Sequence, residues 1–191
     1  PIWGPVTTGN ARWFSPNVKR YPASVDTAKS LLAGLGLQNP DADEWLEDAK
    51  GTEARFTILT IRGSTQLERS AAVLRDDLKQ VGIAVDVETL EQGAAIQQML
   101  KGQFDAIFIF FSASDLDPSM NKDFWQSSGG SHMWNPGQAR PGTDWEARID
   151  QLSVQLASAV DPAERKRLFD EVQEVFADNL PVLYFVAPRL Y

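Results

Sequence analysis

The sequence predicts an α/β domain, a layered parallel sheet flanked by helices. Residues 56–62 are rich in β-branched and aromatic residues, residues 65–81 repeat apolar residues at helical intervals, and residues 83–88 alternate apolar with acidic residues. This strand–helix–strand unit predicts a right-handed crossover joining parallel strands. Residues 104–111 are almost continuously apolar, which predicts a strand buried on both faces at the centre of the sheet.

Capping signals predict further helices around this sheet. Ser24 is a predicted N-cap for a helix that ends at Gly34 or Gly36, and a short helix is predicted over 94–100. Additional helix starts are the Thr65/Glu68 and Thr143/Glu146 capping-box pairs and Asp161-Pro162, and a last strand is predicted over 182–186.

Two segments lack regular periodicity. The first, residues 1–22, is rich in Pro, Gly and aromatic residues and is predicted to be a connecting segment before a single α/β domain over 23–191. The second, residues 112–142, holds several turn dipeptides together with Trp134 and His132, the only histidine. A loop of this length in a compact domain is typically functional or mobile.

Composition excludes several classes of function. The net charge of −8 disfavours a nucleic-acid partner, and residues 165–167, the one dense basic run, are interpreted as a solvated helix face. No apolar run is long enough to span a membrane. The absence of cysteine removes thiol chemistry, and neither a dinucleotide fingerprint nor a phosphate-binding loop is present. We therefore expect no cofactor.

Candidate catalytic and metal-binding groups are weak. His132 lies in a Gly-rich loop without a nucleophile motif, so an ordinary loop or surface histidine is expected. Asp115 and Asp117 could form a carboxylate pair, but Asp117 precedes a proline and equally suits a helix N-cap. The acidic residues of 41–48 lack the spacing of a calcium loop and indicate a solvated turn. We expect neither an enzyme nor a metal site.

Position in the fold indicates a binding site instead. Ligands of open α/β sheets bind beyond the carboxyl ends of the strands. The loop over 111–117 leaves the most apolar strand and carries an aromatic side chain, hydroxyls and carboxylates. That mixture suits a polar solute, although an ordinary strand-to-helix turn is an equally good interpretation.

Several short motifs, in order along nearly the whole chain, resemble the C-terminal half of family-5 solute-binding proteins, the group that includes oligopeptide- and dipeptide-binding proteins. They are YPASVDTAKSLL at 21–32 with its Gly-Leu-Gly ending, LERSAA at 67–72, LKQVGI at 78–83, GQFDA at 102–106, DLDP at 115–118, DPAER at 161–165 and LPVLY at 180–184.

The resemblance implies one lobe of a type II periplasmic-binding-protein fold and the substrate-capture subunit of an ABC importer. Its implied partners are a small polar solute held between two lobes, the N-terminal lobe of the parent protein, and the ABC permease subunits. It also implies a periplasmic or extracellular location, with a lipid anchor as one means of attachment, and that this chain is part of a longer protein.

The resemblance also implies the ligand-binding residues. Phe111 takes the place of a Trp that ends the apolar strand in peptide binders, Ser114 that of an Asp that holds the peptide amino group, and Gln92 that of a Trp that covers the ligand. An Arg that binds ligand carboxylate in some members falls at Phe108. A buried ammonium without its carboxylate is costly, so Ser114 widens the expected solute from a peptide to other polar solutes.

The predicted ligand-binding residues are therefore Phe111, Ser112, Ser114, Asp115, Gln92 and Trp134. Phe111 is expected to stack on the solute, and Asp115 to offer a carboxylate in place of the one absent at 114. Two alternatives remain open. One is a sensory or interaction module built on the same bilobed fold, and the other is a hydrolase that uses Asp115 and Asp117.

Overall fold

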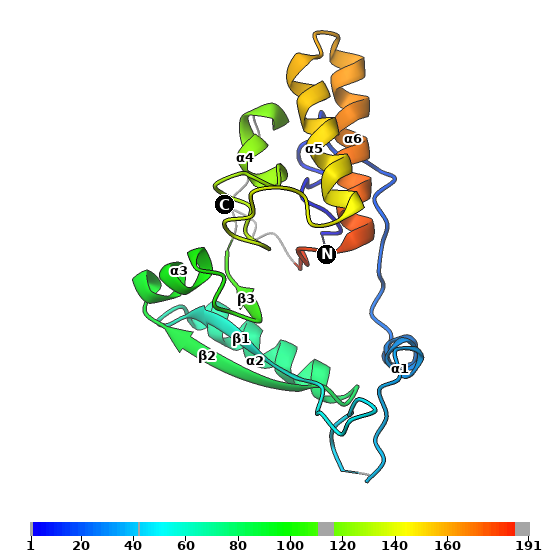
Figure 1. The fold of residues 1–191 in the computed structure, drawn as a ribbon, viewed down its shortest axis with the longest axis vertical. Coiled ribbons are helices and arrows are strands. Elements are labelled where there is room, and N and C mark those ends of the chain that lie inside the picture. The colour runs from blue at the N-terminus through cyan, green and yellow to red at the C-terminus, as the bar shows by residue number, and fades with distance from the viewer. Residues whose placement is uncertain (1, 42, 111–116, 186–191) are drawn as a thin grey trace. The chain divides into compact units, whose positions relative to one another are not determined.

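The computed structural model describes residues 2–41, 43–110 and 117–185. The chain forms two compact units. Unit 2 is Pro22–Phe111, and unit 1 combines Pro1–Tyr21 with Ser112–Tyr191. The sequence predicted a connecting segment followed by one domain; instead, the first 21 residues cluster with the C-terminal part of the chain. Figure 1 shows the helices and strands of both units.

Unit 2 contains a parallel sheet. Its strands are β1 (Arg55–Ile61), β2 (Ala84–Leu90) and β3 (Ala106–Phe108), in the order β2-β1-β3. Both pairings of β1 are parallel. The predicted α/β class and parallel strand–helix–strand unit are thus confirmed.

Helices lie on both faces of this sheet. Helix α2 (Thr65–Lys79) packs its buried Ala71 against the face that carries Ile58 and Val85. Helix α3 (Gln92–Leu100) contacts β1 and β2 from the other face (Figure 1). Helix α1 (Val25–Gly34) begins at the predicted N-cap, because the Ser24 side chain accepts a hydrogen bond from the Thr27 amide.

The central strand of the sheet is β1, which corrects the prediction for residues 104–111. Among the described residues, β3 is a three-residue edge strand that is only partly buried, whereas Ile58, Leu59 and Thr60 are buried on β1. An uninterrupted apolar run reports the hydrophobicity of a strand and not its place in the sheet. Because β1 contains two threonines, Thr57 and Thr60, it is less hydrophobic than residues 104–111 although it is the central strand.

Thr60 on β1 forms a side-chain hydrogen bond to β3 near the carboxyl ends of the two strands. Its side chain is fully buried, and its Oγ1 donates to the Phe108 carbonyl at 2.8 Å. We expect Thr60→Val to lower the free energy of unfolding by about 1 kcal/mol, because a buried donor to this carbonyl is lost. Urea unfolding of the full-length protein measures the change. Thr57→Val, on the opposite face of the same strand, is the control; an equal loss there would contradict the assignment.

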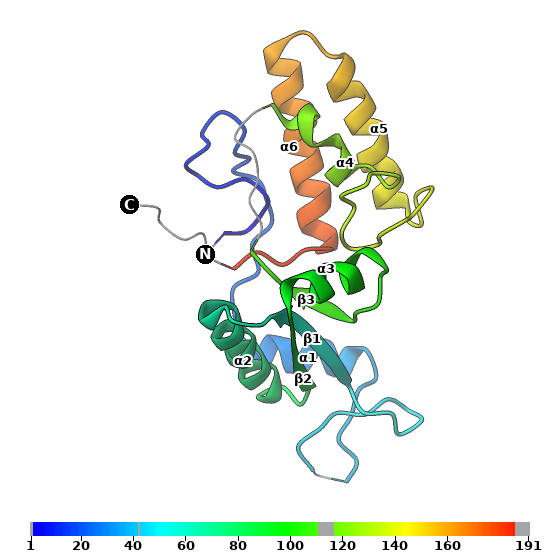
Figure 2. The ribbon, with the colours of Figure 1, turned by 90° about the vertical axis from the view of Figure 1, so that its left-hand side faces the viewer.

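Unit 1 is helical. A 3₁₀ turn (Pro118–Asn121) leads into the short helix α4 (Lys122–Trp125). Helices α5 (Asp144–Ser158) and α6 (Pro162–Asn179) then run side by side as a hairpin (Figure 2). Asp161 caps α6 through the Glu164 amide at 2.9 Å, as predicted.

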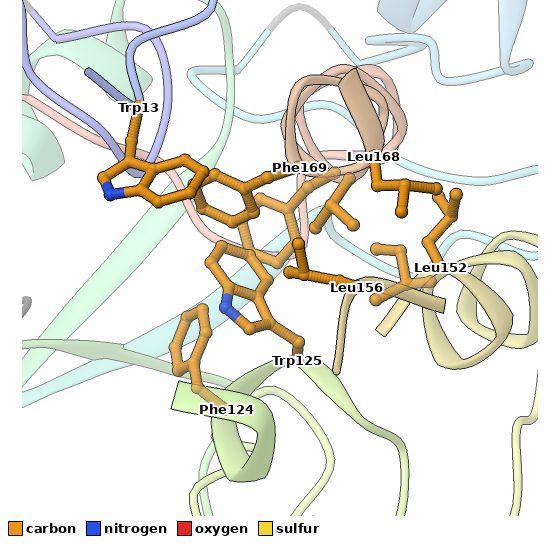
Figure 3. Close-up of a cluster of buried hydrophobic side chains, with 10 residues drawn as sticks. Trp13, Phe124, Trp125, Leu152, Leu156, Leu168 and Phe169 are labelled. Carbon is orange, nitrogen blue, oxygen red and sulfur yellow. The ribbon is translucent and has the colours of Figure 1, made fainter. Parts of the chain in front are cut away.

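The core of unit 1 lies between this hairpin, α4 and the N-terminal segment (Figure 3). Its buried members are Trp13, Phe124, Trp125, Ile149, Leu152, Leu156, Leu168, Phe169, Val172 and Phe176. The N-terminal segment is fixed by Trp13, whose ring meets Phe169 edge-on at 5.9 Å and whose carbonyl accepts from Gln173 Nε2 at 2.8 Å. Residues 1–21 therefore contribute to a core.

The C-terminal part differs from prediction. Helix α6 ends at Asn179, and Leu180 adopts a left-handed conformation with φ of 51°. The described residues 182–185 are not in a strand. Apolar and aromatic content favours extended backbone, and the Phe185 carbonyl does accept from the Ile2 amide at 3.2 Å, but a strand needs a ladder of such bonds. In the part of the chain that the structure describes, no helix is long and apolar enough to cross a membrane.

Candidate functional site

The candidate site begins at the carboxyl edge of the sheet in unit 2, where β1 and β2 end side by side. The Arg62 amide donates to the Leu90 carbonyl at 2.7 Å, so the pairing continues one residue beyond β1. Arg62 also donates through Nη2 to the Thr89 carbonyl at 3.0 Å and lies 3.8 Å from the Glu91 carboxylate. These contacts fix the loop that precedes α3.

Gln92 is the first residue of α3 at this edge, and its side chain is exposed. The residue before it, Glu91, makes no side-chain hydrogen bond to the helix start. The first amides of α3 are thus left without a capping side chain. Gln92 therefore lies where a polar solute at the carboxyl edge of the sheet could reach it.

Four of the predicted ligand residues, Phe111, Ser112, Ser114 and Asp115, lie outside the described residues. The described chain before them ends at Phe110, whose side chain is 54% exposed. These four assignments remain predictions.

The described chain resumes at Asp117, which caps the 3₁₀ turn. Its Oδ1 accepts from the Ser119 amide at 3.0 Å and from the Ser119 hydroxyl at 2.7 Å, and its carboxylate forms an ion pair with Arg165. Burial raises the pKa of Asp117, but these hydrogen bonds outweigh it, so the pKa is lowered. The N-cap interpretation of Asp117 is confirmed.

Trp134 belongs to an aromatic cluster in unit 1. It is partly buried, and its ring centroid lies 5.4 Å from that of Phe124, 5.2 Å from that of Phe176 and 3.9 Å from that of His132. Its indole Nε1 donates to Glu146 Oε1 at 3.3 Å. Much of the Trp134 side chain is thus in contact with other residues of unit 1. A solute contact at Trp134 stays a prediction.

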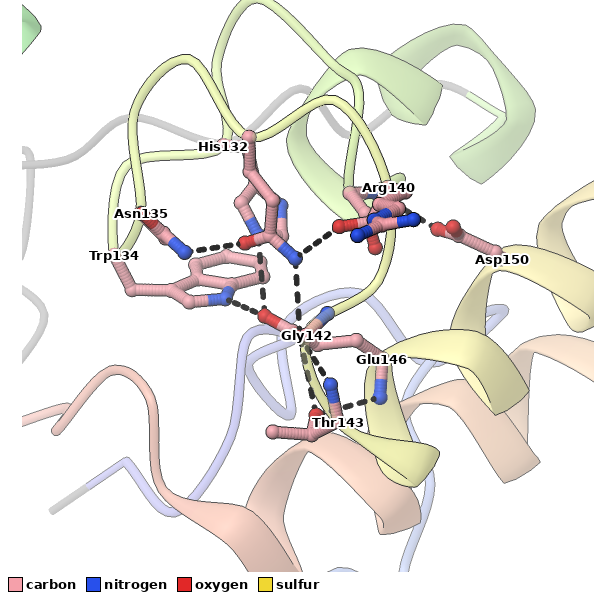
Figure 4. Close-up of polar contacts among 10 residues, drawn as sticks. His132, Trp134, Asn135, Arg140, Gly142, Thr143, Glu146 and Asp150 are labelled. Atoms are coloured by element: carbon pink, nitrogen blue, oxygen red, sulfur yellow. Dashed lines mark hydrogen bonds and ion pairs between the residues drawn. The ribbon is translucent and has the colours of Figure 1, made fainter.

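Glu146 is the centre of a polar network that the sequence only half revealed (Figure 4). The predicted capping box with Thr143 is present. The same carboxylate also accepts from the Gly142 amide at 2.8 Å and from Gln138 Nε2 at 3.1 Å. Burial raises the pKa of Glu146, but hydrogen bonds to its carboxylate lower the pKa by more, so the net shift is downward. The donors are Gln138, Gly142, Trp134 and Thr143.

His132 is buried beside this carboxylate, with 2% of its surface exposed. Its Nε2 lies 3.5 Å from Glu146 Oε1, and neither ring nitrogen has a hydrogen-bond partner among the described residues. His132 lies in a loop, as predicted, but it is buried and is not a surface histidine. A single histidine in a polar loop carries no sequence signal for burial; the neighbouring aromatic residues were the only hint.

Arg165 is a second residue whose role the sequence missed. The run 165–167 was interpreted as a solvated helix face, yet the Arg165 side chain is only 16% exposed. Arg167 fits the interpretation better, because it is exposed and pairs with Glu164 on the same helix. In the described part of the chain, no group of three His, Asp or Glu residues could hold a metal ion.

A comparison with protein-family models shows which proteins this chain is related to. The model described as "Bacterial extracellular solute-binding proteins, family 5 Middle" matches residues 1–133. The chain belongs to this family.

Other members of family 5 support this. The oligopeptide-binding protein AppA of Bacillus subtilis is 25% identical over 190 residues, which cover 92% of this chain and 33% of AppA. The chain thus spans about a third of the length of the curated relatives it matches.

Solved structures of family-5 type confirm the fold. The structure of Bacillus subtilis AppA in complex with a nonapeptide matches 94% of this chain and 35% of that one, with a TM-score of 0.77 and 22% identity. The periplasmic binding protein MelB of Agrobacterium fabrum, in complex with stachyose, matches 86% of this chain and 26% of that one, with a TM-score of 0.75 and 24% identity. The predicted resemblance is confirmed.

Proposed function

We propose that the protein containing this chain is the extracytoplasmic substrate-capture subunit of an ABC importer, which binds a peptide or another small polar solute between two lobes. The observation that carries this proposal is the match of nearly the whole chain to family-5 binders, in sequence and in fold. The N-terminal lobe of the parent protein would form the facing wall, and the permease subunits would receive the solute. Attachment by a lipid anchor is part of the same proposal.

The proposed contacts follow the carboxyl edge of the sheet. Phe111 would stack on the solute, while Ser112, Ser114 and Asp115 would supply polar contacts. Gln92 would contact the solute at the carboxyl edge, and Trp134 is a further predicted contact. Gln92 supports this assignment by its exposed position at the start of α3. The hollow of about 350 Å³ on the α3 face of the sheet does not, because its lining includes Thr57 and Asp105, near the amino ends of β1 and β3.

Solute identity is left as a class because similar folds hold different solutes. One similar structure contains a nonapeptide and another contains stachyose. Calorimetry of the full-length protein should therefore use a tripeptide, a nonapeptide and stachyose as probes. We expect one of them to bind, and Phe111→Ala and Asp115→Ala each to weaken that binding at least tenfold, about 1.4 kcal/mol. Unchanged affinity in both variants would refute the site assignment.

The hydrolase alternative is disfavoured by the state of Asp117. A general acid needs a proton to give near neutral pH, whereas hydrogen bonds from Ser119 and Arg165 lower the pKa of this carboxyl. We therefore assign Asp117 no general-acid role. Turnover of a bound probe by the intact protein, abolished in Asp117→Asn, would reverse this. In a sensory role, the protein would bind the same probes, but uptake of those probes into the cell would not require this protein and its permease.

A further inference from the structure

Arg165 connects three segments of unit 1. Its Nη1 donates to the Leu156 carbonyl at 2.7 Å and to the Ala159 carbonyl at 2.8 Å, at the C-terminal end of α5. Its Nη2 donates to the Ser119 hydroxyl at 3.2 Å and contacts the Asp117 carboxylate. The arginine itself lies in the first turns of α6. One guanidinium thus ties the start of the 3₁₀ turn to both helices of the hairpin.

The geometry of this contact requires arginine. The planar guanidinium presents donors in several fixed directions, so it serves two backbone carbonyls and a carboxylate at once. A lysine at 165 would keep the positive charge, but one ammonium on a flexible stem cannot hold all these acceptors in the same arrangement. Because only 16% of the Arg165 side chain and 31% of the Asp117 side chain are exposed, solvent screens the pair less than an ordinary surface ion pair.

The place of Asp117 in the chain gives the contact a function. Asp117 lies two residues after Asp115, the last residue of the proposed solute-binding segment. Binding segments contribute affinity when their ends are held in the bound geometry before the ligand arrives, because less conformational freedom is then lost on binding. A clamp at this point therefore acts on the segment without touching the solute.

We propose that Asp117 and Arg165 are positioning residues for solute binding, a clamp that fixes the chain at the C-terminal end of the binding segment. This inference rests on the proposed function. It assigns Arg165 no contact with the solute. The two kinds of contact made by Arg165 have different roles. Its bonds to the Leu156 and Ala159 carbonyls stabilise the end of α5, whereas its contact with Asp117 acts on the binding segment.

Asp117→Asn isolates the clamp. Oδ1 of Asp117 accepts from both Ser119 and Arg165, and asparagine keeps that oxygen but removes the negative charge that pairs with the guanidinium. Arg165 keeps its two carbonyl partners on α5. The matched control is Glu171→Gln, which neutralises a carboxylate of the same hairpin; Glu171 Oε1 accepts from Arg148 Nε at 2.9 Å, between α6 and α5. Arg165→Lys tests whether charge alone is enough.

Two measurements on the full-length protein decide the matter. Amide hydrogen exchange over residues 118–124 should become faster in Asp117→Asn and Arg165→Lys but not in Glu171→Gln. The affinity for whichever of the tripeptide, nonapeptide and stachyose probes binds should fall about tenfold in the first two variants and stay within twofold in the control. Melting temperatures of Asp117→Asn and Glu171→Gln should agree closely.

The outcomes separate this inference from the proposed function. Unchanged exchange in Asp117→Asn overturns the clamp whether or not a probe binds. Faster exchange with unchanged probe affinity shows a purely structural contact and also overturns it. If wild-type protein binds none of the three probes, the proposed function fails for these solutes, and the positioning role fails with it.

Discussion

Gly129→Ala is expected to lower the free energy of unfolding by about 3 kcal/mol or more. A Cβ atom built on Gly129 would lie 2.0 Å from the Asp123 carbonyl oxygen and 2.5 Å from its carbon. Both are backbone atoms of helix α4, so no side-chain rotation relieves the overlap. The loop would have to move away from the helix, and the hydrogen bond from the Ser131 amide to the same Asp123 carbonyl, 3.1 Å long, would be lost.

The adjacent glycine provides the control for this experiment. A Cβ on Gly130 meets nothing within 4 Å, and its φ is not positive. Gly130→Ala should therefore change the free energy of unfolding by less than about 0.5 kcal/mol. Urea unfolding of both full-length variants, followed by tryptophan fluorescence, measures the difference, because Trp125 and Trp134 lie in unit 1. Equal stability of the two variants would contradict the close packing of the loop on α4.

Local rules explain what could be predicted from the sequence. Hydrogen bonds from side chains to nearby backbone define helix starts within four residues, so Ser24, Asp117, Thr143 and Asp161 all cap helices where expected. One start shifted by a residue: Ser64, not Thr65, accepts from the Leu67 amide. The parallel unit was predictable for the same reason, since its periodicity changes from two to 3.6 and back within one short stretch.

Contacts between distant residues could not be predicted. Arg165 and Asp117 are 48 positions apart, and nothing in the basic run at 165–167 distinguishes the more buried Arg165 from the exposed Arg167. The position of β3 at the edge likewise depends on strand order, which hydrophobicity does not encode. For the candidate binding site, position after an apolar strand indicated the loop over 111–117, whereas Gln92 was assigned from the resemblance alone; both assignments stay predictions.

Glu146→Gln is expected to have the second large effect, a loss of about 3 kcal/mol at neutral pH. The carboxylate is 5% exposed and accepts hydrogen bonds from two backbone amides, Gly142 at 2.8 Å and Thr143 at 3.0 Å. A glutamine amide must either turn its NH₂ toward these donors or give up the Trp134 indole on the other oxygen. Either choice leaves a buried donor without its acceptor, which costs more than the hydrogen bond itself contributes.

The pH dependence of this loss distinguishes the charge from the shape of Glu146. Its pKa in the folded state lies below the ordinary value of 4.5, so the unfolded chain binds a proton first as the pH falls. The stability that the carboxylate contributes is therefore complete above about pH 4.5 and is lost as the pH falls through the folded-state pKa.

Urea unfolding of wild type and Glu146→Gln from pH 7 to pH 3 tests this charge dependence. The stability difference should be largest at neutral pH and should narrow toward the acid end. Glu171→Gln, in the same hairpin but at a partly exposed ion pair with Arg148, should show a difference of about 0.5 kcal/mol at neutral pH. A gap between wild type and Glu146→Gln that stays constant across the range would mean that Glu146 acts through its shape, and that the ionised carboxylate is not what holds the loop over residues 134–143 in place.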